Sequence, residues 1–351
     1  PLYQGFETNI MAGASGAPPS YFLPYETRKG SDGGKGFEPY SGGEEGEYLT
    51  DRLTDEALRF IEAKKDKPFL LVLAHYAVHT PIQAPEELSK KYRRKIREEG
   101  ITEGGPNSDR DVAKDNTGVY KTVQNNAVYA GMVESVDTNL GRIMHRLDEL
   151  GLSDNTVLIL SSDHGGLSSR GLNSGRELAT SNLPYRHGKG WLYDGGLRVP
   201  LVVKWPGKVE PGSVSAVQVT GTDHYPTLLE LAGVPLQPEH HRDGRSYLGA
   251  LHGKDYVRDP MFFHSALGRP TQTGDTRSSA VIHGDWKLIQ WYSLEDESIE
   301  RTELFNLAND PYEHADLYTD EPVKAAELQA MLNEWKLSVN ARLGQFKRGG
   351  I

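Results

Sequence analysis

Apolar residues along the first two thirds of this chain follow two patterns, one typical of helices and one typical of buried strands. Helical spacing predicts a helix that begins near residue 51 and a longer one over about residues 123–150. Unalternating apolar runs follow at 69–74 and 156–160, and a shorter run lies at 201–204. Runs of this kind suit strands that are buried on both faces of a parallel sheet. The charged stretch over residues 85–120 shows no clear period and is predicted to be an exposed, irregular excursion.

The pattern changes after about residue 255. Two short apolar segments, 279–282 and 286–291, flank His-Gly-Asp and predict an antiparallel hairpin, and a final helix carries Leu328, Leu332 and Trp335. We therefore predict an α/β fold with a mostly parallel sheet flanked by helices. The main α/β domain is expected over residues 1–254, and a smaller α+β subdomain of antiparallel sheet plus helix over residues 255–351.

Composition narrows the classes of function. The 351 residues are 37% hydrophobic and 25% charged, as in ordinary globular proteins, and the formal net charge of −10 argues against a nucleic-acid-binding surface. No apolar run approaches the roughly twenty residues of a membrane span, and no signal peptide is recognisable at the start of the chain. The absence of cysteine excludes disulfides, thiolate metal sites and a cysteine nucleophile within these residues.

Polar side chains follow two of the predicted strands, where a parallel sheet binds its ligands. His79 follows the first run, and Asp163-His164 follows the second, directly before Gly165 and Gly166. A carboxylate and an imidazole can ligate one cation, and the glycines allow the backbone to turn away. The pair also fits an ordinary turn with a loop histidine, and His79 alone fits a strand-end residue with a satisfied hydrogen bond.

A third cluster is RHGKG at residues 186–190, in which two glycines bracket Lys189. The backbone can approach a ligand closely there, and the ammonium group can project into a site. The spacing does not fit a Walker A loop, and a solvated basic loop is the plain alternative. The chain contains no Gly-x-Ser-x-Gly, Gly-x-Gly-x-x-Gly or His-Glu-x-x-His motif.

Five segments in order resemble one known family. They are HTPIQAP, LSSDHGG, TSNLPYRHGKGWLYDGGLRVPLVVKWPG, TDHYPTLLELAGV and ELFNLANDPYEHADLY, and the resemblance runs from about residue 5 to residue 320. Together they resemble the formylglycine-dependent sulfatases of the alkaline-phosphatase-like superfamily. The resemblance implies a large α/β domain with a smaller C-terminal domain, a sulfated carbohydrate or aryl sulfate as substrate, and a periplasmic or secreted location.

The resemblance also implies roles for single residues. Asp163 and His164 match a pair of metal ligands, Lys189 matches the lysine that binds sulfate, and His79 matches the histidine near the leaving oxygen. Two further residues, Arg186 and His264, stand where family members often contact substrate. The resemblance implies calcium as the metal, and magnesium and zinc are the alternatives. Coordination chemistry alone would make an imidazole ligand favour zinc or another transition metal.

One departure from the family pattern concerns the nucleophile. The family's formylglycine is made from the Cys or Ser of C/S-x-P-S-R, and these residues contain neither cysteine nor that serine motif. The formylglycine is therefore expected in a missing N-terminal segment, and the chain alone is expected to be inactive. The alternatives are a phosphodiesterase or phosphatase of the same superfamily, or a non-catalytic anion-binding module. The expected partner is a sulfated small molecule or glycan.

Overall fold

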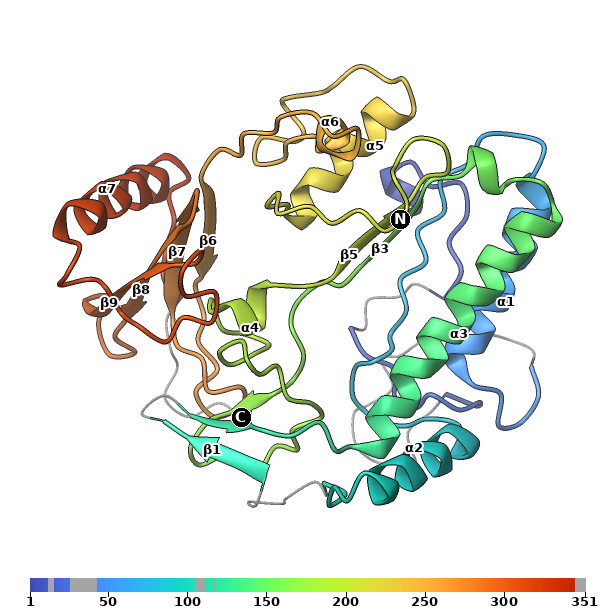
Figure 1. Ribbon diagram of the computed structural model, residues 1–351, viewed down its shortest axis with the longest axis horizontal. Coiled ribbons are helices and arrows are strands. Elements are labelled where there is room, and N and C mark those ends of the chain that lie inside the picture. Colours follow the sequence, from blue (N-terminus) through green and yellow to red (C-terminus); the bar gives the residue numbers. More distant parts are fainter. Residues whose placement is uncertain (12–15, 26–42, 105–110, 116–117, 345–351) are drawn as a thin grey trace. The chain divides into compact units, whose positions relative to one another are not determined.

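The computed structural model describes residues 1–11, 16–25, 43–104, 111–115 and 118–344 (Figure 1). The chain forms two compact units, of which the first holds residues 1–105 and 125–156 and the second holds residues 106–124 and 157–351. Each unit has its own hydrophobic clusters. The division of the chain at residue 254 stays a prediction.

Helices dominate the first unit. Its elements are η1 (Leu2–Gln4), α1 (Leu49–Lys64), α2 (Glu86–Glu98), α3 (Ala127–Glu149) and η3 (Ser153–Asn155). Helix α3 lies against both α1 and α2 (Figure 1). It begins where the Asn126 side chain accepts a hydrogen bond from the Tyr129 amide, at 3.0 Å, because an Asn N-cap satisfies an otherwise unpaired helical N–H.

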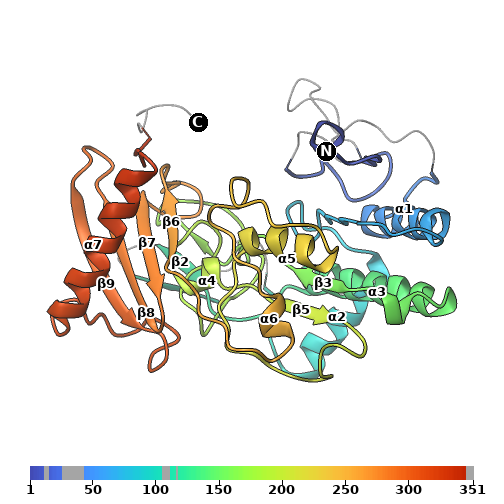
Figure 2. The same cartoon turned by 90° about the horizontal axis from the view of Figure 1, so that it is seen from above.

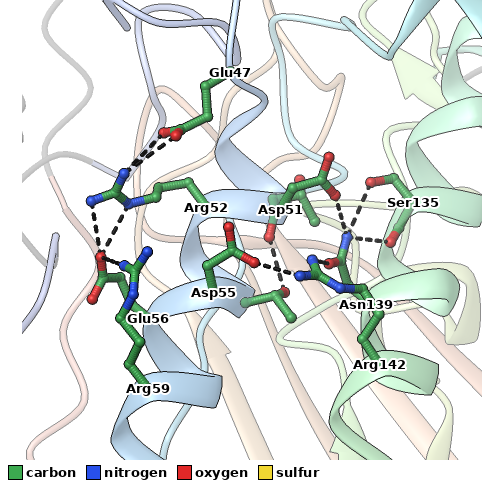
Figure 3. A network of polar contacts seen from close by, with 11 residues as sticks. Glu47, Asp51, Arg52, Asp55, Glu56, Arg59, Ser135, Asn139 and Arg142 are labelled. Carbon is green, nitrogen blue, oxygen red and sulfur yellow. Dashed lines mark hydrogen bonds and ion pairs between the residues drawn. The ribbon is translucent and has the colours of Figure 1, made fainter. Parts of the chain in front are cut away.

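Polar contacts fix the register of α1 against α3 (Figure 3). The Asn139 amide nitrogen donates to Asp51 Oδ1 at 2.6 Å, and Arg142 donates to Asp55 at 2.5 Å. An apolar cluster of Ile61, Ile143 and Leu147 also joins the two helices. The helices predicted near these positions are confirmed.

The apolar run at 69–74 differs from the prediction. Phe69, Leu71 and Leu73 pack on the cluster between α1 and α3, whereas Leu70 is 54% exposed and Val72 is 60% exposed. The run forms no ladder with any strand of the described ranges. A strand buried on both faces was therefore the wrong prediction for this structure, because a uniformly apolar run does not reveal that only one of its faces finds a partner.

Residues 86–98 were also wrongly predicted as irregular, since they form α2. The charges of this helix are arranged as neighbours one turn apart, such as Arg94 with Glu98 at 3.7 Å. Its apolar stripe is narrow, with Ile96 as its one buried hydrophobic residue among the thirteen. The high charge therefore hid a surface helix.

Within the described residues, the second unit contains three antiparallel sheets, several short helices and one long C-terminal helix. Strands β1 (Val112–Lys114), β2 (Val119–Lys121) and β4 (Ser169–Arg170) form one sheet, and β3 (Leu158–Ser161) pairs with β5 (Leu201–Lys204). Strands β6 (Met261–Ser265), β7 (Ser278–His283), β8 (Trp286–Tyr292) and β9 (Ile299–Asn306) form a meander. The helices are α4 (Asp194–Leu197), η4 (Gly221–Asp223), α5 (His224–Leu231), α6 (Leu248–Leu251) and α7 (Pro322–Ser338).

The C-terminal sheet and helix agree with the prediction. Helix α7 lies along one face of the meander (Figure 2), where Leu328 and Leu332 pack on Val281, Leu288 and Leu304. The predicted hairpin is the β7–β8 pair, which turns at Gly284 with φ of 57°. That left-handed conformation favours glycine.

The α/β class is confirmed, with one difference in strand direction. Every ladder between the described strands is antiparallel, including that of β3 with β5. The two predicted sheet strands do pair with each other, but Leu158 to Ser161 run antiparallel to Leu201 to Lys204. Val202 in this pair remains 55% exposed. Of the described helices, none combines the length and the apolar character needed to cross a membrane.

Candidate sulfate and metal site

Strand β3 ends one residue before the Ser162-Asp163-His164 turn of the second unit. The His164 Nδ1 atom lies 2.9 Å from the Gly165 carbonyl oxygen. Because a carbonyl only accepts, Nδ1 must carry the proton, and Nε2 of the neutral ring keeps its lone pair. That Nε2 atom lies 3.2 Å from Asp163 Oδ2. Two atoms of the kinds that can bind a cation therefore face each other beyond the strand, on side chains that are 38% and 82% exposed.

This pair matches the donor chemistry of a divalent-cation site in part. A histidine ligand is usually oriented by a hydrogen bond from its other ring nitrogen, as His164 is. Within the described ranges, however, no group of three or more His, Cys, Asp or Glu side chains could hold a metal ion. Asp163 and His164 are thus suited to supply two ligands of a larger set.

Glycines after the pair are required by close backbone packing. A Cβ atom on Gly165 would lie 1.8 Å from the Gly195 carbonyl oxygen, and the Gly165 amide donates to the Gly196 carbonyl at 2.9 Å. A Cβ atom on Gly188 would lie 2.4 Å from the Gly166 carbonyl oxygen. These distances exclude any side chain, so the motif glycines bring the turn after β3 against the 186–196 loop.

The Lys189 side chain lies near this turn. Its amide donates to the Gly166 carbonyl at 3.0 Å, and Gly190 adopts φ of 98°. Burial lowers the pKa of Lys189, as do the positive charges of Arg176 and Arg269, while the Asp163 carboxylate acts in the opposite direction. Lys189 therefore lies within electrostatic range of Asp163, and their membership of a shared site stays a prediction.

Asn182 holds the loops of this site together and was missed in the sequence. Its amide nitrogen lies within hydrogen-bond distance of four oxygens, at 3.0 to 3.1 Å: the carbonyls of Gly166, His187 and Gly195, and Ser168 Oγ. One side chain thereby ties the turn after β3 to the 186–196 loop. The sequence around Asn182 carries no signal for this role, since the contacts depend on how the segments 5 to 16 residues away fold around it.

Arg186 is engaged by an acidic and aromatic cluster. Its guanidinium stacks over the Tyr193 ring at 4.1 Å and lies 3.4 Å from Glu303 Oε1. The other Glu303 oxygen accepts from Tyr193 and from Trp291, both at 2.6 Å. Substrate contact by Arg186 stays a prediction, and the structure adds a positioning network behind it.

His264 is also engaged within the protein. On β6, its Nδ1 atom lies 2.8 Å from Ser279 Oγ, and its Nε2 atom lies 2.9 Å from the Arg342 carbonyl oxygen. Both ring nitrogens thus have partners in the C-terminal region. Substrate contact by His264 remains a prediction that would require one of these hydrogen bonds to break.

His79 belongs to the first unit, in the segment after the 69–74 run. Its Nδ1 atom lies 2.8 Å from the Thr80 carbonyl oxygen, and its own carbonyl accepts from the Tyr21 hydroxyl at 3.0 Å. The carbonyl partner places the proton on Nδ1, so the neutral ring directs a lone pair from Nε2. The Thr80 hydroxyl also lies 3.2 Å from Nδ1, so both polar groups of Thr80 fix the orientation of the ring.

Comparison with known proteins gives a consistent set of relatives. Residues 4–234 match the family model described as Sulfatase, and residues 186–340 match that of N-sulphoglucosamine sulphohydrolase, C-terminal. A protein of Formosa agariphila named Sulfatase is 32% identical over 323 residues, covering 85% of this chain and 52% of that protein. The N-acetylgalactosamine-6-O-sulfatase of Bacteroides thetaiotaomicron is 27% identical over 303 residues, with coverages of 83% and 51%.

Human steryl-sulfatase is 31% identical over 217 residues, which cover 62% of this chain and 32% of that enzyme. The chain therefore spans about half or less of the length of these relatives. Among solved structures, Ps i-CgsB in complex with k-i-k-neocarrahexaose aligns with a TM-score of 0.65 and 25% identity, over 87% of this chain and 58% of that chain. The four motif residues His79, Asp163, His164 and Lys189 all lie inside the first matched region.

Proposed function

This chain belongs to the sulfatase family, and from that premise we propose that it provides the sulfate-binding part of an enzyme that hydrolyses sulfuric esters. The observation that carries the proposal is the grouping of Asp163, His164 and Lys189 in the second unit. A carboxylate, an imidazole and a half-buried ammonium group suit a cation and a sulfuryl group side by side.

Each residue has a distinct role in this proposal. Asp163 and His164 would hold a divalent cation, for which we propose calcium, with magnesium or zinc as alternatives. When bound, the cation polarises the sulfuryl oxygens. Lys189 binds another sulfuryl oxygen, and its partial burial strengthens that attraction because less water screens the charge.

The departing alcohol requires a proton when its bond to sulfur breaks. We propose that protonated His79 donates this proton from Nε2, while the Nδ1 hydrogen bond to Thr80 keeps the ring oriented. A hydrated formylglycine, which these residues do not contain, would supply the oxygen that attacks sulfur. Arg186 and His264 are proposed substrate contacts.

A sulfated carbohydrate is the proposed substrate class, and an aryl sulfate is the alternative. The N-acetylgalactosamine-6-O-sulfatase and the Ps i-CgsB complex with a neocarrahexaose support a carbohydrate, while steryl-sulfatase supports the alternative. A periplasmic or secreted location is proposed with this substrate class.

Two measurements test the proposal. The 351-residue chain should not turn over 4-nitrophenyl sulfate, because it contains neither cysteine nor Ser-x-Pro-Ser-Arg. The full polypeptide that contains this chain should hydrolyse sulfate esters, and Lys189→Ala should lower kcat/KM by about a hundredfold or more, as for loss of one charge-stabilising donor. Exposed Lys208 gives the matched control, Lys208→Ala.

Several outcomes would contradict the proposal. Turnover by the 351-residue chain would mean that the nucleophile lies within it. Preference for a phosphate ester over the matching sulfate ester would indicate a phosphatase or phosphodiesterase instead. Sulfate binding without turnover of any ester by the full polypeptide would indicate a non-catalytic anion-binding protein.

A further inference from the structure

Three loops of the second unit meet beside Lys189. They are the segments 166–176, 186–191 and 267–276, and main-chain groups join them. The Lys189 amide donates to the Gly166 carbonyl at 3.0 Å, and the Gly171 amide donates to the Gln272 carbonyl at 3.2 Å. The Trp191 indole N–H donates to the Thr273 carbonyl at 3.0 Å. These contacts fix the three backbones relative to one another.

Two of these loops carry an arginine that the matched sulfate motif does not explain. Arg269 lies against the backbone of Gly190, since a Cβ atom there would be 2.7 Å from its Nη2 atom. Its side chain remains 42% exposed, with Nε 3.6 Å from Asp275 Oδ1. Arg176 follows Gly175 on the first loop, and its backbone carbonyl accepts from Arg170 at 2.9 Å.

Charges of the same sign are concentrated here. Burial and the Arg269 guanidinium lower the pKa of Arg176, and both arginines lower the pKa of Lys189. Asp275 is fully buried behind Arg269, and burial raises the pKa of its carboxyl group. Lys189, Arg176 and Arg269 therefore lie within electrostatic range of one another, with Asp163 near Lys189 and Asp275 near Arg269 as partial counter-charges. The three cations attract anionic oxygens.

The Arg269 guanidinium is 42% exposed beside the Gly190 backbone, so it can contact an anionic group in addition to the one that Lys189 binds. Lys189 alone matches the motif for the scissile sulfate, and a guanidinium offers two parallel N–H donors to a planar carboxylate or a sulfate. We propose that Arg176 and Arg269 form a second anion subsite beside Lys189, which recognises another sulfate or carboxylate group on the same substrate. This inference rests on the proposed sulfatase function and specifies its substrate as a glycan with at least two anionic groups.

Kinetics of the full polypeptide test this subsite. The probes are hexose and hexosamine monosulfates, the corresponding disulfates, and disaccharides in which the monosulfated sugar is joined to a uronic acid. Arg176→Gln and Arg269→Gln should each raise KM for a substrate with two anionic groups by about tenfold, as for one lost charge-assisted hydrogen bond. The kcat values and the KM for monosulfates should change by less than about twofold, and Arg→Lys variants should recover part of the loss.

Arg245→Gln is the matched control, since it removes the same charge from an arginine whose partner is the exposed Asp259. Thermal unfolding of each variant shows whether the loops remain folded. A larger effect on the disulfates than on the uronic-acid disaccharides identifies sulfate as the second group, and the reverse identifies a carboxylate.

The proposal is overturned if the wild-type protein shows no preference for doubly anionic substrates across the panel. It is also overturned if the Gln variants raise KM for monosulfates and disulfates equally, because the arginines would then act on the scissile sulfate only. If no sulfate ester is turned over at all, the proposed function fails separately. Calorimetric binding of the same sugars to wild-type and Gln variants then decides the subsite alone.

Discussion

His75 should make the stability of the first unit depend on pH. It follows the 69–74 run directly, and burial lowers the pKa of His75 to about 4 from the usual 6.5. Its Nδ1 atom is buried and has no hydrogen-bond partner among the described residues. The folded protein therefore holds His75 neutral at pH values where the unfolded chain already binds a proton.

The sign and size of the effect follow from this difference. As the pH falls below 6.5, the unfolded state gains a proton first, so stability decreases until the pH reaches the folded pKa near 4. Between pH 7 and pH 5 the two pKa values correspond to a loss of about 2 kcal/mol, at 1.36 kcal/mol per unit. Replacement of His75 by Leu removes the titration and should remove that part of the loss.

Hydrogen exchange of α1 amides measures the effect, because all five tryptophans lie in the second unit and fluorescence would miss the first. The pH 7 to pH 5 decrease in protection, corrected for intrinsic exchange, should be about 2 kcal/mol larger in the wild type than in His75→Leu. His145→Gln is the control, since this histidine of α3 has a side chain that is 75% exposed. Equal pH dependence of wild type and His75→Leu would refute the reasoning.

Two further substitutions probe the second unit. Lys287→Met should destabilise it by about 3–5 kcal/mol, because the buried ammonium contacts Asp194 Oδ1 at 2.8 Å and Glu313 Oε1 at 2.7 Å, and two buried carboxylates would lose their cation. Urea unfolding followed by tryptophan fluorescence measures this, and a loss below 1 kcal/mol would contradict a buried charge network. Asn182→Ala should cost about 1–3 kcal/mol and weaken sulfate binding, since the two N–H donors that the amide offers to four nearby oxygens are lost. Calorimetric titration with inorganic sulfate checks the second effect, and unchanged affinity would separate Asn182 from the site.

Local patterns predicted helices α1, α3 and α7 and the C-terminal hairpin, because these depend on nearby residues, whereas the high charge of residues 86–98 hid helix α2. The β7–β8 turn at Gly284 and the helix over Pro322–Ser338 were readable from spacing alone. The strands were harder. Every position of 69–74 is apolar, so the pattern does not distinguish the exposed Leu70 and Val72 from their buried neighbours. The direction of the β3–β5 pair depends on how the chain returns over some forty intervening residues.

The candidate site divides in the same way. Asp163, His164 and Lys189 were found because each is a reactive side chain in a short, specific motif. Asn182 and Arg269 were missed because they are recognisable only from their contacts in the folded chain, such as the hydrogen bond of Asn182 to the Gly166 carbonyl and the approach of Arg269 to Gly190. Functional residues that share one short segment can be predicted from the sequence. Functional groups that come together from several loops can be identified only in the folded structure.

The glycines of the motifs are as informative as the ligands. Gly165 and Gly188 leave no space for a Cβ atom, since the nearest oxygens would lie 1.8 and 2.3 Å away. Any side chain at either position would separate the turn that carries His164 from the loop that carries Lys189. Main-chain contact therefore sets the spacing of Asp163, His164 and Lys189. The glycines of the two motifs are needed for this backbone packing, and the polar residues supply the reactive groups.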